Sequence, residues 1–243
     1  MREALVRGNG PILLLAWTAG YLNALSFLGL RTFTANMTGN TVLLGLAIAQ
    51  LDRGALLRTV TSMAGFCLGA FGGTFIVIRN RTQSEGSWTP RITIALFIES
   101  CLLLFFAVIW ASTREAIPHD TLIVEELITL DAVAMGQQSA TMLSFSIPAV
   151  STTYITGTIT NLMMGLSKQL IFKRSPDPTA GAQTDGRLTT YLAAVWLTYL
   201  VAAILGGLGD IFFSEIAVFL PLIAILIVTL CALANQRACT AKD

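Results

Sequence analysis

The chain of 243 residues is 54% hydrophobic and only 12% charged, and its mean hydropathy of +0.72 lies above the range of soluble globular proteins. A net charge of +1 gives no reason to expect nucleic acid or a strongly acidic partner. The four cysteines share no CxxC or metal-ligand spacing, and the single histidine, His119, excludes a histidine-rich metal site. We therefore expect a membrane protein without a metal or any other cofactor.

A helix that crosses a bilayer takes about 20 apolar residues, and six segments of the chain have about this length. They are Pro11–Leu30, Leu57–Ile78, Ile92–Trp110, Leu122–Leu143, Leu188–Gly209 and Ile216–Ala234. The first follows Arg2 and Arg7 as the apolar part of a signal peptide would, but it lacks a small-residue cleavage site. We interpret it as a retained transmembrane helix. The loops are short, so the sequence predicts an all-α protein with one transmembrane domain over residues 1–243.

Two further segments, Phe33–Ala49 and Ser151–Leu170, resemble each other. Both open with Thr and aromatic or β-branched residues, reach a Thr-Gly step, and continue as a short apolar helical pattern with an internal glycine. The motif GYLNA precedes the first copy, and GQQSA precedes the second at nearly the same distance. Self-similarity on this scale predicts an internal repeat, with one half at residues 11–110 and the other at 122–235.

The polar first half of each copy is unusual for a helix that faces lipid. Non-helical backbone at membrane depth is tolerated only where protein or a wet cavity satisfies its hydrogen bonds. We therefore interpret each copy as a broken segment, in which a short extended piece leads into a half-helix. Each half-helix is expected to begin near Thr38 or Thr156, with the threonine as an acceptable N-cap.

The same motifs carry a family resemblance. AGYLNALSFLGL followed by FTANMTGNTVLLGLA, with AMGQQSA and STTYITGTIT in the second half, resembles the YoaK-like family of small bacterial membrane proteins, a domain of unknown function. The resemblance covers almost the whole chain. It implies a multi-pass protein of the bacterial inner membrane with about six spans, and it implies no substrate or reaction.

The path of the two broken segments decides the symmetry of the protein. If they re-enter the membrane, six helices cross and the halves are inverted; if they cross it, there are eight crossings and parallel halves. The positive-inside rule does not separate the two, because each leaves four basic residues outside and eleven of the 15 inside, with both termini cytoplasmic. We favour six crossings because the broken segments are short and because the resemblance implies about six spans.

The paired Thr-Gly segments are the strongest functional signal. In transporters built from repeats, discontinuous helices meet near the membrane midplane, and their ends bind substrate or ion. A half-helix N-terminus offers unpaired N–H groups and the positive end of the helix dipole, which suit a small anion, a carboxylate or a neutral polar solute. The candidate binding residues are Asn23, Asn36, Thr38, Gly39, Asn40, Gln137, Tyr154, Thr156, Gly157, Thr158 and Asn161. The alternative is that these polar groups only join the extended pieces to neighbouring helices.

Two carboxylates, Glu99 and Asp131, lie inside apolar segments. Intramembrane acids usually face a cavity or a partner, because a central charge costs roughly 2.5–3.5 kcal/mol. The two helices are consecutive and antiparallel, so a rise of 1.5 Å per residue puts both acids roughly 15 Å from the same face. They can therefore meet near the midplane and share a proton, which predicts a coupling pair for a proton or cation. The alternative is that hydroxyl or amide groups of neighbouring helices satisfy each of them.

Gly65, Gly69 and Gly73 repeat at every fourth position, and Gly206 and Gly207 occupy the corresponding place in the second half. Small residues at this spacing let two helices approach closely. We expect helix packing here, either within the chain or between copies in a homo-oligomer.

These features favour a small secondary transporter or channel-like permease in the lipid bilayer, coupled to protons through the two acids. The alternative is a membrane scaffold or assembly partner that uses the glycine-rich helix and transports nothing. An enzyme is the weakest of the hypotheses, because no cysteine or histidine has a partner at catalytic spacing and no HExxH or GxSxG motif is present.

Overall fold

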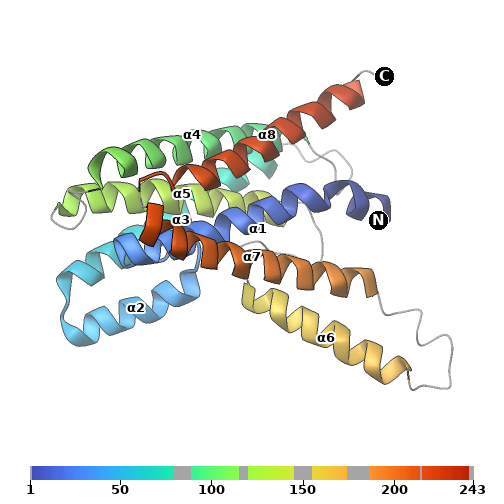
Figure 1. Cartoon of the computed structure of the whole chain (residues 1–243), viewed down its shortest axis with the longest axis horizontal. Coiled ribbons are helices and arrows are strands. Elements are labelled where there is room, and N and C mark those ends of the chain that lie inside the picture. The colour runs from blue at the N-terminus through green and yellow to red at the C-terminus, as the bar shows by residue number, and fades with distance from the viewer. Residues whose placement is uncertain are drawn as a thin grey trace.

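The computed structural model of the chain describes residues 2–78, 89–114, 120–144, 155–173, 186–213 and 215–240. These residues form eight α-helices and contain no strand (Figure 1). The helices are α1 (Arg2–Leu30), α2 (Met37–Gln50), α3 (Arg53–Ile78), α4 (Pro90–Thr113), α5 (Thr121–Ser144), α6 (Ile155–Lys173), α7 (Gly186–Phe213) and α8 (Phe219–Thr240).

Six of the helices, α1, α3, α4, α5, α7 and α8, are long and lie along the long axis of the molecule (Figure 1). Each of the six predicted apolar segments falls largely within one of them. Several begin earlier than predicted: α1 starts at Arg2 and α3 at Arg53. α8 starts later, at Phe219, because the preceding residues form turns. Successive long helices run in opposite directions, so α1 begins and α8 ends at the same end of the bundle.

Four helices of the described chain are both long and apolar enough to cross a membrane. The spans are Gly10–Leu30, Arg53–Val77, Pro90–Thr113 and Gly186–Phe213, and α8 contributes a shorter apolar stretch, Phe219–Ala234. α5 is as long as α4 but carries three acidic side chains, Glu125, Glu126 and Asp131, which lower its hydropathy. The helical membrane protein predicted from the sequence is thus confirmed, with four of the six predicted spans both long and apolar enough to cross a membrane in the described chain.

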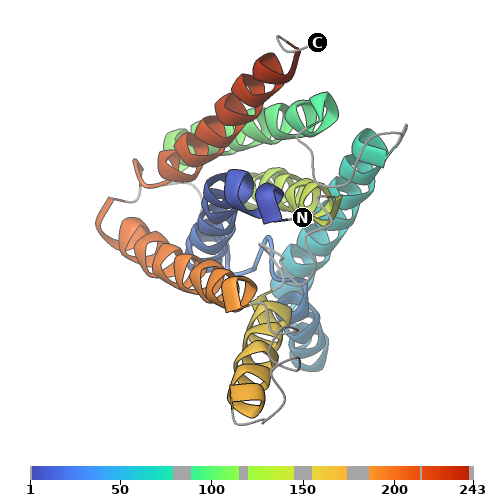
Figure 2. The same cartoon turned by 90° about the vertical axis from the view of Figure 1, so that its right-hand side faces the viewer.

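The two short helices, α2 and α6, correspond to the two Thr-Gly segments. Each begins near the middle of the long axis, and they run to opposite ends, α2 to the end where α3 begins and α6 to the end where α7 begins (Figure 1). Both lie on the same side of the bundle (Figure 2). A non-helical linker, residues 31–36, connects α1 to α2. We call it the first linker.

The helix starts lie close to the predicted positions, but the predicted caps were wrong. Asn36, not Thr38, is the N-cap of α2, and its side-chain oxygen accepts a hydrogen bond from the Gly39 N–H at 3.1 Å. Asn has the geometry to reach back to the third N–H of a helix and is among the best capping residues. α6 begins at Ile155, so Thr156 lies in its first turn and does not cap it. Both Thr-Gly steps are therefore helical.

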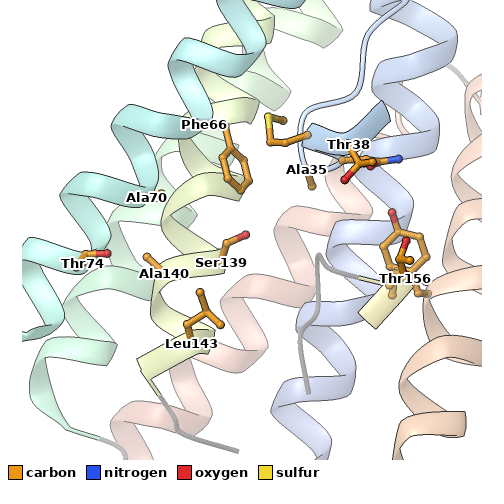
Figure 3. A pocket seen from close by; sticks show the side chains of 13 residues that line it. Ala35, Thr38, Phe66, Ala70, Thr74, Ser139, Ala140, Leu143 and Thr156 are labelled. Carbon is orange, nitrogen blue, oxygen red and sulfur yellow. The ribbon is translucent and has the colours of Figure 1, made fainter. Parts of the chain in front are cut away.

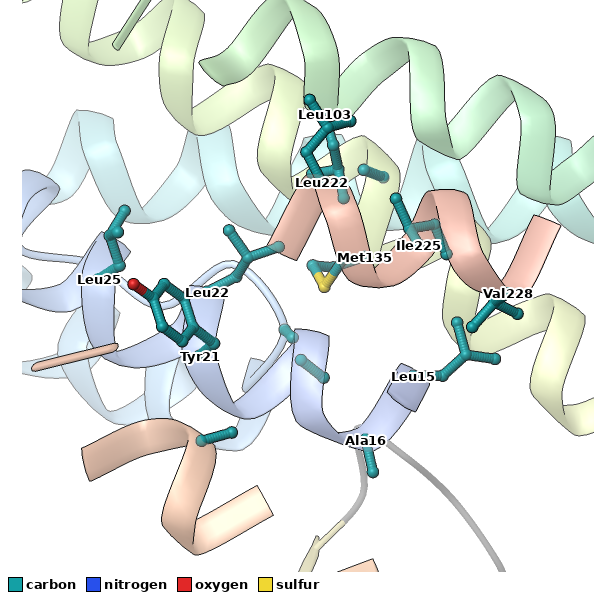
Figure 4. Packing of buried hydrophobic residues seen from close by; sticks show 14 of the residues in the cluster. Leu15, Ala16, Tyr21, Leu22, Leu25, Leu103, Met135, Leu222, Ile225 and Val228 are labelled. Carbon is teal, nitrogen blue, oxygen red and sulfur yellow. The ribbon is translucent and has the colours of Figure 1, made fainter. Parts of the chain in front are cut away.

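α1 is the central helix of the bundle (Figure 2). It packs along α7 and also contacts α8 and α5, whereas α3 packs along α5. α4 lies on α5 and α8, α2 on α3, and α6 on α7. The core is built around α1, where Tyr21, Leu22 and Leu25 are fully buried among side chains such as Met135 of α5 and Ile225 of α8 (Figure 4).

Glycines bring helix backbones into contact in the two most extensive helix pairs, α1 with α7 and α3 with α5. A Cβ atom on Gly20 of α1 would collide with the Tyr199 carbonyl of α7, and one on Gly206 of α7 would press on the Tyr21 backbone of α1. In the other pair, a Cβ on Gly136 of α5 would collide with the Phe66 carbonyl of α3. Close approach of this kind requires residues without side chains at the crossing.

The glycines predicted to pack helices differ in what they face. Gly65, Gly69 and Gly73 of α3 all face the backbone or side chains of α5 within the same chain. Gly206 faces α1, as just described. Gly207 makes no close approach, because the nearest atom to an added Cβ would be Leu28 Cδ1 at 3.8 Å.

The ends of α4 and α7 are joined by an ion pair. Arg114 Nη2 lies 2.6 Å from Asp210 Oδ1, and the Arg114 guanidinium also lies over the Trp110 ring, 4.8 Å from its centroid. Both charged side chains are largely shielded, with exposures of 22% and 10%. This contact links the first half of the sequence to the second at the end of the bundle opposite the start of α1.

Candidate functional site

A cavity of about 700 Å³ lies between the first turns of α2 and α6 and the facing sides of α3 and α5. Figure 3 shows Thr38 and Thr156 on one side of it, with Phe66, Ala70, Ser139 and Ala140 across from them. The lining residues are Ala35, Asn36, Met37, Thr38, Phe66, Ala70, Thr74, Ser139, Ala140, Leu143, Ile155, Thr156 and Tyr199. We call this space the central cavity. No charged side chain is among the described residues that line it.

The two Thr-Gly steps bring free polar groups to this cavity. The side chains of Thr38 and Thr156 are both exposed to it, and neither hydroxyl makes a hydrogen bond within the described chain. The first N–H groups of a helix have no intrahelical acceptor, and those of Met37, Thr38, Ile155 and Thr156 make no backbone hydrogen bond to the described residues. The cavity wall thus offers hydrogen-bond donors from two helix N-termini.

Tyr199 completes the wall from α7, and a buried amide holds it. Asn23 of α1 donates to the Tyr199 hydroxyl at 2.6 Å and accepts from the Ala35 N–H at 3.0 Å. Asn23 is only 4% exposed and is not among the residues that line the cavity. This predicted binding residue therefore positions two parts of the cavity wall, one from each half of the sequence.

Asn40 has a similar supporting place beneath the first linker. It is fully buried; its side-chain oxygen accepts from the Phe33 N–H at 3.0 Å and from Thr32 Oγ1 at 3.2 Å. Its side-chain nitrogen donates to the Phe33 carbonyl at 2.6 Å and to Ser62 Oγ at 3.0 Å. The amide is thus occupied by protein groups, and Asn40 does not line the cavity.

Of the remaining predicted binding residues, some line the central cavity and others do not. Asn36, Thr38 and Thr156 line the central cavity. Gln137 does not: it is buried and donates to the Ala95 carbonyl of α4. The others among the described residues that do not line it are Gly39, Gly157, Thr158 and Asn161. Tyr154 lies outside the described residues.

Glu99 of α4 and Asp131 of α5 are both fully buried, on helices that pack against each other, and their charges interact. We call them the carboxyl pair. Ser26 of α1 donates a hydrogen bond to Asp131 Oδ2 at 2.6 Å. The other Asp131 oxygen and both Glu99 oxygens have no hydrogen-bond partner within the described chain.

The sequence did not single out three residues of this region: Ser26, Thr34 and Tyr199. Ser26 lies three residues after Asn23, and this spacing places both side chains on one helix face. That pattern is the signal that could have found it. Thr34 belongs to the first linker, and its buried hydroxyl interacts with the Asp131 carboxyl without the geometry of a full hydrogen bond. Nothing in the sequence around Tyr199 distinguishes it from other aromatic residues of a membrane helix.

The outer surfaces of α3, α4, α7 and α8 carry many exposed apolar side chains, such as Phe71 of α3, Phe97 of α4 and Phe212 of α7. A soluble monomer rarely exposes so much contiguous apolar area. Together with the apolar spans, this surface defines a helical transmembrane protein with a partly open, largely apolar cavity that carries a few polar groups.

The chain belongs to the family described as "Protein of unknown function (DUF1275)", whose profile matches residues 12–231. It is 32% identical over 219 residues to the UPF0700 transmembrane protein YoaK of Bacillus subtilis (strain 168), covering 89% of this chain and 90% of that protein. The resemblance predicted from the Thr-Gly motifs is confirmed. No solved structure matches the chain.

Proposed function

We propose that this protein is a small permease that passes a small anionic or neutral polar solute across the membrane, and that the solute occupies the central cavity. The observation that carries the proposal is that the first turns of α2 and α6, from opposite halves of the sequence, line one cavity. The Thr38 and Thr156 hydroxyls and the first N–H groups of both helices have no acceptor among the described residues, and a solute with acceptor oxygens would satisfy them.

The composition of the cavity wall narrows the solute class. Helix N-termini favour negative charge, each by roughly 0.3–1 kcal/mol, and the two first turns converge here. The absence of Lys or Arg among the described lining residues disfavours a multiply charged anion such as phosphate, which usually requires cationic side chains. A monovalent carboxylate or a neutral polar molecule fits this wall best.

The proposed topology has six crossings, with α2 and α6 as half-helices that do not cross. The opposite directions of α2 and α6 from the middle of the bundle support this arrangement (Figure 1). The matching pairs α1 with α7 and α3 with α5, and α2 with α3 and α6 with α7, support an inverted repeat. In this topology Arg31, Arg53, Arg58 and Arg114 are the basic residues outside, and both termini are cytoplasmic in a bacterial inner membrane.

Proton coupling through the carboxyl pair is part of the proposal. Two fully buried acids on packed helices, without a cationic partner in the described chain, are a chemically suitable proton carrier. The expected direction of the effect is that a pH gradient drives solute accumulation in wild type and no longer does so in Asp131→Asn.

A flux assay in proteoliposomes tests the proposed function. The probes are radiolabelled acetate and urea, one monovalent carboxylate and one neutral polar solute. We expect protein-dependent flux of at least one probe, reduced several-fold in Thr38→Val and in Thr156→Val. The matched controls are Thr41→Val and Thr160→Val, one turn further along each helix and off the cavity wall, which should keep wild-type flux. Equal flux in cavity and control variants would refute the assignment of the site.

The scaffold alternative has lost its main support. Its key feature was the glycine face of α3, and this face is occupied by α5 within the chain. Another protein could bind it only by displacing α5.

A further inference from the structure

The carboxyl pair lacks the partners that two ionised carboxylates would need. Both side chains are fully buried, and three of their four oxygens have no hydrogen-bond partner within the described chain. Two unpaired carboxylates at such a place would be very costly, because a buried charge requires a partner or a proton. One proton shared between them removes one charge and supplies the missing hydrogen-bond donor.

The groups that face the pair from each packed helix supply no cation. α3 carries Arg53 and Arg58 in its first two turns, about two turns from the level at which Gly65 meets Thr129 and Ala132 of α5. The rest of α3, from Thr59 to Ile78, contains no Lys, Arg or His, and neither does α1 from Ile12 to Leu30 or α8 from Phe219 to Ala234. Their titratable side chains are Tyr21, which donates to the Ala217 carbonyl, and the cysteines Cys67 and Cys231, which are exposed on the outer surface. The remaining charged groups of α4 and α5 in the described chain are Arg91, Glu125 and Glu126, toward the helix N-termini.

The hydrogen bond from Ser26 distinguishes the two acids. The Ser26 hydroxyl donates to Asp131, which stabilises the ionised form of that carboxyl, whereas Glu99 receives no hydrogen bond from the described chain. A proton on Glu99 would remove one of the two interacting negative charges and leave Asp131 as the ionised member of the pair. The proton is released when the Glu99 O–H bond breaks and the proton passes to water.

A continuous series of contacts connects Asp131 with the central cavity. The buried Thr34 hydroxyl, itself without a hydrogen-bond partner in the described chain, lies beside Asp131 on the first linker. The next residue, Ala35, lines the cavity and is held by Asn23, which also holds Tyr199. A change of charge at Asp131 therefore acts directly on the segment that precedes α2.

We propose that Glu99 and Asp131 form a binding site for one exchangeable proton, carried by Glu99 while Asp131 is ionised, and that its release draws the Thr34 hydroxyl onto Asp131 and shifts the cavity wall at the start of α2. This proton site would be the coupling site of the proposed permease, and its biological role rests on that proposed function. Loss of the proton leaves Asp131 with an unsatisfied oxygen, and Thr34 is the nearest free donor. The solute site and the proton site are thereby linked through the first linker.

The first test is infrared difference spectroscopy of the purified full-length protein in lipid bilayers. We expect a C=O band of a protonated, buried carboxyl group that is lost in Glu99→Gln and shifted in Asp131→Asn. Glu126→Gln, which changes an exposed carboxyl on α5, is the matched control and should leave the band unchanged. A band that persists unshifted in both Glu99→Gln and Asp131→Asn overturns the proton site.

The second test measures the link to the cavity. In a background without the native cysteines, the rates at which Thr38→Cys and Thr156→Cys react with a small thiosulfonate reagent are compared across pH. Each rate is first divided by the thiolate fraction of its own cysteine, obtained from a separate titration of that thiol, so that the ratio reports access and not ionisation. We expect the ratio to change with pH when the carboxyl pair is intact and to become constant in Asp131→Asn.

Thr34→Val tests the coupling between the proton site and the cavity without removing either carboxyl group. It should keep the infrared band but abolish the pH dependence of the rate ratio. A constant ratio in the intact pair, or an undiminished pH dependence in Thr34→Val, overturns the link. Neither readout requires solute flux, so a failed flux assay would refute the permease function and leave the proton site standing.

Discussion

The side-chain nitrogen of Asn23 lies 2.6 Å from the hydroxyl oxygen of Tyr199, and the same Asn23 amide accepts a hydrogen bond from the Ala35 N–H. One buried residue of α1 therefore fixes the first linker and α7 relative to each other at the wall of the central cavity. Its loss should affect stability and the cavity together.

Tyr199→Phe should destabilise the protein by about 1–3 kcal/mol, because it leaves the buried Asn23 amide without its acceptor. Asn23→Ala should cost more, since it also leaves the Ala35 N–H unpaired. Thermal unfolding of detergent-purified variants measures both effects. If Tyr199→Phe proved more harmful than Asn23→Ala, the bridging role of Asn23 would be refuted.

Gly69→Ala should strongly destabilise the packing of α3 on α5, because the new Cβ would collide with the Val133 carbonyl. Overpacking typically costs about 1–3 kcal/mol, and a rigid backbone atom leaves little room to relax. Gly72→Ala on the same helix meets nothing within 4 Å and should instead be neutral or stabilise the helix by up to about 1 kcal/mol. Unfolding temperatures of the two variants in one detergent should differ in this direction.

Asn40→Ala should destabilise the fold by on the order of 3 kcal/mol, because it removes the hydrogen bonds of a buried amide to Thr32, Phe33 and Ser62 and leaves the Phe33 N–H unpaired. Thr41→Ala, at the next position but exposed, removes only a bond to the carbonyl one turn earlier and is the control. Yield of folded protein and thermal unfolding provide the measurement. Equal stability of the two variants would contradict the role assigned to Asn40.

The Arg114–Asp210 pair should show a coupling of about 1–2 kcal/mol in a double-mutant cycle with Arg114→Gln and Asp210→Asn. This value lies above that of a fully exposed pair because both side chains are largely shielded. Arg114→Lys should recover only part of it, since lysine lacks the planar group that lies over Trp110. Additive effects of the two single substitutions would mean that the pair contributes nothing.

The sequence predicted the positions of the helices better than the contacts of their polar groups. Hydropathy and length placed the six long helices, and the Thr-Gly repeats placed the starts of α2 and α6 within two residues. The depth argument placed Glu99 and Asp131 at a common level, and their helices do pack together with both acids buried.

The side-chain roles were harder to predict because they depend on the orientation of each residue around its helix. Asn36, Asn40 and Thr38 lie within five residues, yet one caps α2, one is buried beneath the first linker and one faces the cavity. A polar residue in an apolar segment indicates that a partner exists, but periodicity alone does not identify it. Tyr199 became recognisable only through Asn23, a residue far away in the sequence.

The glycine crossings also constrain how the protein is made. α1 is synthesised before α7, but its most extensive contact is with α7, the seventh of the eight described helices. Until α7 arrives, the backbone groove at Gly20 has no occupant. The first half of the chain thus cannot complete its own packing. During membrane insertion, α1 stays without its main packing partner until α7 has been inserted.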